Sequence, residues 1–176
     1  AFQRAIAKER ADFTPDGLTE YWENEAKTYN ADSMTYLREI ESWIKKTIES
    51  SLEKFYGDNW EIKALPKPIY KRAKGVADER NYDSIASGDS SNVVSVWNCV
   101  TLKECKEIVT VGSHWTELFE SILTRPEEEK LSGGKTARTK WIEQIESLQN
   151  KLNMPSYSVT TAEFEFIKAV YLWTKS

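Results

Sequence analysis

The chain has 176 residues, 40% of them hydrophobic and 30% charged, which is typical of a soluble globular protein of one domain or one domain with an appendage. A core of this size needs no disulfide or metal to hold it. No apolar run approaches the ~20 residues of a membrane-spanning helix. The net charge of −4, from 24 basic and 28 acidic residues, argues against a dedicated duplex-DNA binder, which usually carries a basic excess.

Two cysteines and one histidine restrict the chemistry that is available. Cys99 and Cys105, without a secretory signal sequence, indicate a reducing, cytoplasmic compartment. His114 alone cannot build a multi-histidine site, and two cysteines lack the second pair of a zinc site. We therefore expect no metal and no cofactor, and no association with a membrane. Because the first residue is not Met, we also expect the chain to belong to a larger polypeptide.

The first predicted elements are two short helices and a long one. Helical patterns over 1–12 and 18–29, separated by a turn at 14–17, predict a helical arm or linker over residues 1–30. The long helix should begin with Asp32 or Ser33 as its N-cap and end at Gly57. It opens the predicted domain, which covers residues 31–176.

The next stretch combines a basic helix with a polar loop. Pro68 suits a first helical position, and a basic helix should run from there to Arg80. The residues 81–95 are rich in serine and aspartate, which predicts a solvated loop. A short extended run could follow at 93–97.

Capping boxes mark two of the remaining helices. Thr101 with Glu104 should begin one helix, and Thr160 with Glu163 should begin the last one. Between them we expect a short helix after Ser113 and a strong amphipathic helix over 136–152, which Pro155 ends. Together these elements predict an all-α helical bundle whose last two helices form an antiparallel, C-terminal helical hairpin.

Most motifs that carry chemistry are missing. The run from Gly133 to Thr136 resembles the end of a phosphate-binding loop, but the preceding strand and the first glycine are absent. His114 has no partner that the sequence reveals, so it reads first as a capping or packing residue.

Two groups of basic residues could bind nucleic acid. Lys67, Lys71 and Lys74 recur at helical spacing with Arg72 beside them, and Lys135, Arg138 and Lys140 form a second group, of which Lys135 and Arg138 are the candidates for binding. Both groups could neutralise phosphates, but ordinary surface charge is the simpler explanation in a chain with an acidic total.

Residues 31–176 also carry a resemblance to a known family. The pieces that carry it are Phe55 to Trp60 after the long helix, Leu65-Pro66-Lys67-Pro68 before the basic helix, Thr101-Leu102 at a helix start, Trp115 to Phe119, and Trp141 to Pro155 ahead of the last helix. In this order they resemble the HEPN superfamily (higher eukaryotes and prokaryotes nucleotide-binding). The most similar branch is found at the ends of RNA endonucleases and bacterial conflict-system proteins.

The resemblance implies a ribonuclease site that has lost its chemistry. Active family members carry Arg-x(4–6)-His at the last junction and act as metal-independent ribonucleases, with paired motifs in a dimer. In this chain Gln149 occupies the Arg position, Asn150 matches the polar residue after it, and Met154 occupies the His position. Gln has no charge to hold a phosphate, and Met cannot transfer a proton. The resemblance therefore implies a pseudoenzyme.

Three hypotheses about function follow. The first is a non-catalytic HEPN-like module of a larger bacterial conflict, toxin–antitoxin or anti-phage defence protein, which dimerises, docks a partner or binds RNA. The second is an active ribonuclease with a relocated site that uses His114 together with Lys71 or Arg72. The third is a protein-only sensor or antitoxin-like partner whose acidic surface meets a basic protein.

The last helix predicts an interface. Its inner stripe should join that of the preceding helix in the core, through Trp141, Ile145, Leu148, Phe164, Ile167 and Tyr171. Phe166, Val170 and Trp173 then form a second apolar face. Together with Met154 they are expected to lie in a homodimer, or in a heterodimer with a related domain.

Overall fold

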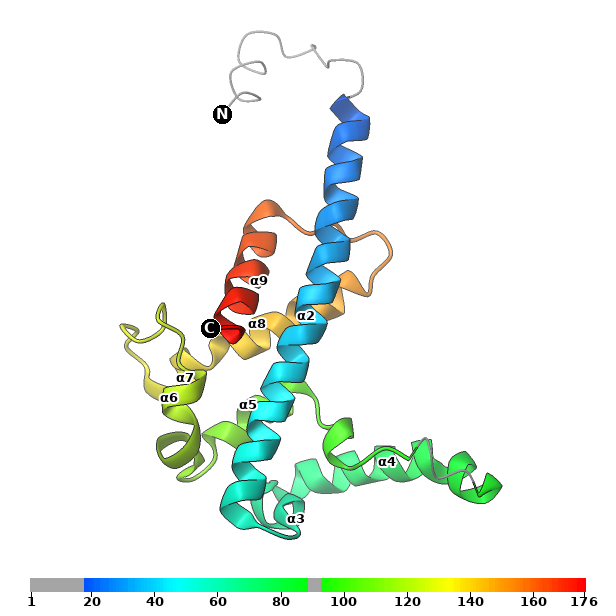
Figure 1. Cartoon of the computed structure of the whole chain (residues 1–176), viewed down its shortest axis with the longest axis vertical. Coiled ribbons are helices and arrows are strands. Elements are labelled where there is room, and N and C mark those ends of the chain that lie inside the picture. Colours follow the sequence, from blue (N-terminus) through cyan, green and yellow to red (C-terminus); the bar gives the residue numbers. More distant parts are fainter. Residues whose placement is uncertain (1–17, 89–92) are drawn as a thin grey trace.

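The computed structural model describes residues 18–88 and 93–176, and every regular element in this part of the chain is helical, which confirms the all-α class (Figure 1). The predicted helix over 1–12 and the turn at 14–17 lie outside the described residues. None of the helices in the described part is long and apolar enough to cross a bilayer. In chain order the elements are α2 (Leu18–Tyr56), α3 (Trp60–Ala64), α4 (Lys67–Ser87), the 3₁₀ turn η2 (Trp97–Cys99), α5 (Leu102–Thr110), the π-turn η3 (Trp115–Phe119), α6 (Glu120–Leu123), α7 (Gly134–Arg138), α8 (Lys140–Leu152) and α9 (Thr161–Thr174).

Helix α2 is one continuous helix of 39 residues, so the predicted N-cap at Asp32 or Ser33 is wrong. No glycine or proline interrupts Leu18–Tyr56, and Ser33 is fully buried instead of capping a helix start. The helix therefore runs across the boundary that the sequence placed between residues 30 and 31. Its end at Tyr56 is as predicted, with a positive φ of 65° at Gly57.

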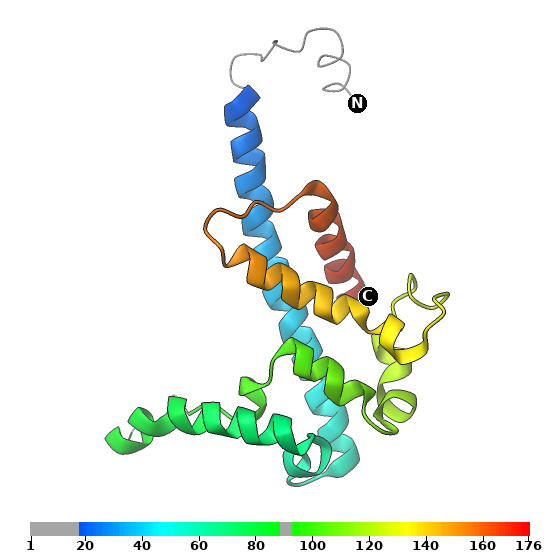
Figure 2. The same ribbon diagram turned by 180° about the vertical axis from the view of Figure 1, so that it is seen from behind.

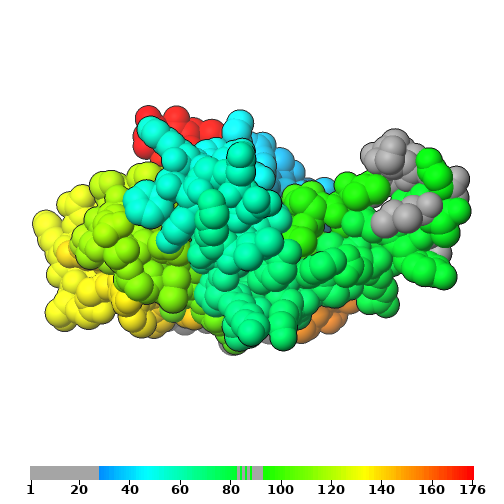
Figure 3. All heavy atoms as spheres, turned by 90° about the horizontal axis from the view of Figure 1, so that it is seen from below, coloured from blue at the N-terminus to red at the C-terminus, as the bar shows by residue number. Residues whose placement is uncertain are grey.

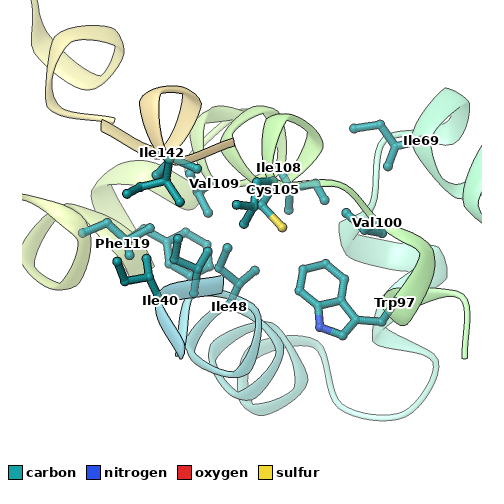
Figure 4. Packing of buried hydrophobic residues seen from close by; sticks show 14 of the residues in the cluster. Ile40, Ile48, Ile69, Trp97, Val100, Cys105, Ile108, Val109, Phe119 and Ile142 are labelled. Carbon is teal, nitrogen blue, oxygen red and sulfur yellow. The ribbon is translucent and has the colours of Figure 1, made fainter. Parts of the chain in front are cut away.

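The core forms around one stripe of α2. The side chains of this stripe recur at helical spacing and are 2% exposed or less, because the other helices pack onto them (Figure 4). They are Leu37, Ile40, Ile44, Ile48 and Leu52. Burial of each such side chain contributes about 1.5–3 kcal/mol.

The last two helices run antiparallel and contact each other at both ends, as the predicted hairpin requires: Lys151 Nζ lies 3.1 Å from Glu163 Oε1 near the turn, and Trp141 meets Trp173 at the other end. Helix α9 packs mainly along α2, while α8 packs on α5 and α2, and the two converge near the C-terminus (Figure 2). Trp141 and Trp173 meet there edge to face, with ring centroids 5.4 Å apart. The predicted inner stripe is buried as expected except for Tyr171, which is half-buried and stacks on Tyr36 at 4.4 Å.

Helix α4 projects from the body of the molecule (Figures 1 and 3). It continues to Ser87, so the predicted loop over 81–95 is helical in its first half. Asn81 explains the difference, because its side chain binds both the N–H and the carbonyl of Val94, each at 2.8 Å. The predicted extended run at 93–97 is absent from the described residues, where η2 follows at Trp97–Cys99.

Other helix starts agree with the sequence. Both predicted capping boxes are present, at Thr101 with Glu104 and at Thr160 with Glu163. The helix expected over 136–152 is divided, because α7 ends at Arg138 and α8 begins at Lys140.

Candidate functional site

The junction that resembles the HEPN motif lies in a groove between α2 and the end of α8, which we name the α2–α8 groove. In Figure 2, α8 crosses in front of α2. The groove encloses about 230 Å³. Its lining combines apolar and polar side chains: Met34, Leu37, Arg38, Glu41, Gln149, Asn150, Leu152 and Asn153.

Gln149 is held in this groove by a carboxylate. Its side-chain nitrogen donates a hydrogen bond of 2.9 Å to Glu41 Oε2 and makes a longer contact of 3.5 Å with the carbonyl of Leu37. The other oxygen of Glu41 lies 3.9 Å from Lys45 Nζ. A negatively charged group therefore lies directly beside Gln149 in the groove.

The other two motif positions face solvent. Asn150 is exposed, and Met154 is 57% exposed in the turn that follows α8. Its backbone N–H donates to the carbonyl of Lys151 at 2.9 Å. An amide and a thioether can form hydrogen bonds and dispersion contacts, but neither can act as a general acid or base.

The loop after the groove is fixed by Glu163. Burial alone would raise the pKa of this carboxyl, but hydrogen bonds from Tyr157, Thr160 and Lys151 lower the pKa to about 2. Asn30 holds the same loop from α2, because it donates to the carbonyl of Tyr157 and accepts from the N–H of Val159. The turn that presents Met154 is therefore anchored on both sides.

The predicted nucleic-acid-binding residues do not form one surface. Lys67, Lys71, Arg72 and Lys74 belong to α4, whereas Lys135 and Arg138 belong to α7, and these helices lie on opposite sides of the body (Figures 1 and 2). Sequence spacing suggested both groups but not their separation, which depends on the long α2 between them.

Four of the six residues already have partners inside the chain. Arg72 binds both carboxylate oxygens of Glu104 and the carbonyl of Cys99. Lys74 donates to Asp78, and this hydrogen bond raises the pKa of Lys74. Lys135 donates to the carbonyl of Thr110, and Arg138 pairs with Glu120. Of the six, only Lys67 and Lys71 are exposed with neither a hydrogen-bond nor an ion-pair partner within the described residues.

His114 does not offer the relocated catalytic site. It is buried, with 5% of its surface exposed. Nδ1 lies 2.8 Å from the carbonyl oxygen of Ile108 and Nε2 lies 2.7 Å from the hydroxyl of Tyr56. Because a carbonyl oxygen only accepts, Nδ1 donates to it, and both ring nitrogens are occupied. His114 ties the end of α5 to the end of α2, which agrees with the packing interpretation; its side chain does not cap the helix that follows it.

The predicted interface on α9 needs correction at Val170. This side chain is fully buried within the chain and offers no surface to a partner. Phe166 and Trp173 are half-buried. Arg125 lies over the ring of Phe166, and Trp173 packs edge to face on Trp43. Of the four predicted interface residues, only Met154 is exposed.

Three residues of the groove escaped sequence reasoning. Met34, Arg38 and Glu41 lie on α2, more than a hundred residues from Gln149 in the sequence. No local pattern connects them to the motif, since their proximity depends on how α8 crosses α2.

Within residues 18–88 and 93–176 no group of three or more His, Cys, Asp or Glu side chains is arranged to hold a metal ion. Comparison of the chain with protein-family models, with curated proteins and with solved structures finds no match in any of the three.

Proposed function

We propose that this chain is a non-catalytic, HEPN-like interaction module that docks a partner protein in the α2–α8 groove. The observation that carries the proposal is the hydrogen bond from Gln149 to Glu41 Oε2. In this bond the side-chain amide of Gln149 donates to a carboxylate, at the position where ribonuclease catalysis would require a positive charge.

Electrostatics argue against phosphate chemistry in this groove. A transferring phosphate needs positive charge where negative charge develops, and Glu41 places a negative charge beside Gln149. Arg38 also lines the groove, but one cation next to a carboxylate leaves little net positive charge. Met154 cannot replace the proton-transferring histidine.

The exposed side chains around the groove favour a protein partner over RNA. Met34 is 38% exposed and Met154 is 57% exposed. Methionine is unbranched and polarisable, so it adapts to apolar partner surfaces. RNA binding would need clustered free cations, whereas Arg72, Lys74 and Arg138 are paired within the chain.

We further propose that the module belongs to a larger bacterial conflict or anti-phage defence protein in the cytoplasm. Its support is the resemblance of the ordered sequence pieces to the HEPN superfamily, including the junction that contains Gln149 and Met154. In such a protein a domain without catalysis supplies a contact surface and leaves the chemistry to other parts.

An RNA cleavage assay tests the loss of catalysis. The protein is incubated with structured and single-stranded RNA, and the products are analysed for 2′,3′-cyclic phosphate ends. We expect no cleavage, because the groove has neither a free cation at position 149 nor a proton-transferring group at position 154. A triple variant with Gln149→Arg, Met154→His and Glu41→Gln restores the missing groups and removes the competing carboxylate. Cleavage by the unmodified protein that survives changes at 149 and 154 would overturn the proposal.

A further inference from the structure

We infer that Tyr56 is a nucleophile activated by His114, and that its hydroxyl accepts an acyl group from an activated ester. Tyr56 is the last residue of α2, which ends beside α3 at the lower end of the molecule in Figure 1. The inference goes beyond the proposed interaction module, because it uses a pocket that shares no lining residue with the α2–α8 groove.

The Tyr56 hydroxyl and the His114 ring are arranged as a nucleophile and its base. The hydroxyl oxygen lies 2.7 Å from Nε2 of His114, and Nδ1 lies 2.8 Å from the carbonyl oxygen of Ile108. Since Nδ1 donates to the carbonyl, neutral His114 has its lone pair at Nε2, and the tyrosine hydroxyl donates to it. An activated nucleophile needs a base within about 2.6–3.2 Å and a third group that orients the base. Tyr56, His114 and the Ile108 carbonyl meet these requirements, so the bond that occupies His114 makes Tyr56 the group that can react.

Neighbouring aromatic rings hold the pair in position. The rings of Tyr56 and His114 meet edge to face, with centroids 5.7 Å apart. Phe55 packs edge to face on Tyr56, and Phe119 does the same on His114. Because these rings are packed together, the hydroxyl and the imidazole are oriented before an acyl donor arrives, which lowers the entropic cost of the reaction.

A pocket gives a small acyl donor access to the pair. Tyr56 and His114 both line it, and it encloses about 360 Å³, a volume suited to a small ligand. Its apolar wall consists of Ala64, Leu65, Pro66 and Val111. Lys63 is the one charged side chain among its described lining residues, and its ammonium group donates to the carbonyl of Tyr56 at 2.9 Å. Acyl transfer develops negative charge on the donor, so a cation and no carboxylate in the lining favours the reaction.

Acyl transfer to Tyr56 balances without any further reactant. A lone pair of the hydroxyl oxygen forms a bond to the carbonyl carbon of the ester, while the hydroxyl proton passes to Nε2 of His114. The bond from that carbon to the leaving oxygen then breaks, and the leaving oxygen takes the proton from Nε2. The products are an acyl ester of Tyr56 and a free alcohol or phenol, and His114 is neutral again.

Acetylation by p-nitrophenyl acetate tests the inference. The full chain is incubated with the ester at neutral pH, and the acetylated tyrosines are quantified by mass spectrometry. Treatment with hydroxylamine distinguishes the two kinds of product, because it cleaves the tyrosine ester and leaves lysine amides intact. We expect Tyr56 to be acetylated at least about tenfold faster than Tyr82, because a positioned base accelerates proton transfer by about 10²–10⁴-fold. Tyr82 is the more exposed of the two, with 72% of its surface accessible, and the only histidine of the chain lies beside Tyr56.

Three variants assign the roles of the two residues. Tyr56→Phe should abolish the hydroxylamine-sensitive label at position 56, and His114→Gln should lower the rate at Tyr56 to about that of Tyr82. Tyr70→Phe, at another half-buried tyrosine, should leave the labelling of Tyr56 unchanged. Circular dichroism verifies that every variant is folded.

The pH dependence of labelling gives a second readout in the unmodified protein, which needs no folded variant. A tyrosine without a base reacts through its phenolate, so the rate at Tyr82 should rise about tenfold per pH unit between about pH 7 and 9. Tyr56 passes its proton to neutral His114, and its rate should rise less than about threefold over the same range. Equal rates at Tyr56 and Tyr82, or the same pH dependence at both, would overturn the inference. Neither outcome bears on the RNA cleavage assay, which tests the proposed function separately.

Discussion

The side-chain amide of Gln149 donates a 2.9 Å hydrogen bond to Glu41 Oε2 and joins residues 108 positions apart. This bond connects the end of α8 to the middle of α2. It also gives Gln149 a structural role within the chain.

Removing this hydrogen bond should lower stability modestly. We expect Gln149→Ala to reduce the free energy of unfolding by about 1 kcal/mol, because a partly buried hydrogen bond to a charged acceptor is lost. Gln144→Ala is the matched control, since Gln144 is an exposed glutamine on the same helix. Urea unfolding of both variants measures the difference. Equal stability of the two variants would show that the Glu41 contact contributes nothing.

The loss of folding stability at acid pH should depend on Glu163. Its folded-state pKa is about 2, against an ordinary value of 4.5. A depressed carboxyl pKa stabilises the folded state above pH 4.5, and this contribution is lost as pH falls from 4.5 through about 2. Glu104 contributes in the same direction, because hydrogen bonds from Arg72 and Thr101 outweigh burial and lower the pKa of its carboxyl.

The Glu163→Gln variant checks this assignment. We expect it to be less stable at neutral pH by about 1–2 kcal/mol, through weakened capping and hydrogen bonding. Its stability should also fall less steeply than that of the unmodified protein as pH drops below 4.5. Glu165→Gln, at an exposed position two residues further along, should behave like the unmodified protein. If the stability of the Glu163→Gln variant fell with pH as steeply as that of the unmodified protein, Glu163 would not be the group responsible.

Arg72 and Lys71 should differ although they are neighbours with the same charge. Arg72 binds Glu104 and the carbonyl of Cys99, so Arg72→Ala should cost about 1–2 kcal/mol of stability. Lys71 is exposed, and Lys71→Ala should be close to neutral. Thermal unfolding distinguishes the variants. If both were equally neutral, Arg72 would be an ordinary surface cation and the predicted phosphate-binding role would regain support.

Gly75 offers a stabilising substitution. It lies inside α4, and a Cβ added there meets nothing within 4 Å. We therefore expect Gly75→Ala to raise stability by about 0.5–1 kcal/mol through helix propensity. Gly57→Ala is the contrasting variant, because Gly57 has a φ of +65° and alanine is strained there. A destabilised Gly75→Ala variant would contradict the open space that surrounds this position in α4.

Local signals in the sequence predicted much of the fold. The capping boxes at Thr101 and Thr160 were predicted from a spacing of three residues, and both are present. The end of α2 at Gly57 follows from one glycine in a left-handed conformation. These features depend on neighbouring residues only, so sequence patterns can identify them.

The errors arose where distant residues decide the structure. Asn30 and Asn81 resemble loop or capping residues in sequence, but each binds backbone groups of a segment elsewhere and remains within a helix. Val170 resembled a second apolar face, yet it is buried within the chain. The α2–α8 groove was missed for the same reason, because Arg38 and Glu41 meet Gln149 only in the folded chain.

The side-chain amide signals of Gln149 in a nitrogen-15 NMR spectrum test the central claim most directly. They report on the α2–α8 groove at the motif position itself, and those of Gln144 serve as a control on the same helix. The protein is titrated with a single-stranded RNA oligonucleotide. The account predicts that the Gln149 signals stay unchanged as RNA is added, because Glu41 occupies the Gln149 amide and places a negative charge in the groove. Saturable shifts of the Gln149 signals with RNA at micromolar concentration, with the Gln144 signals unchanged, would contradict it.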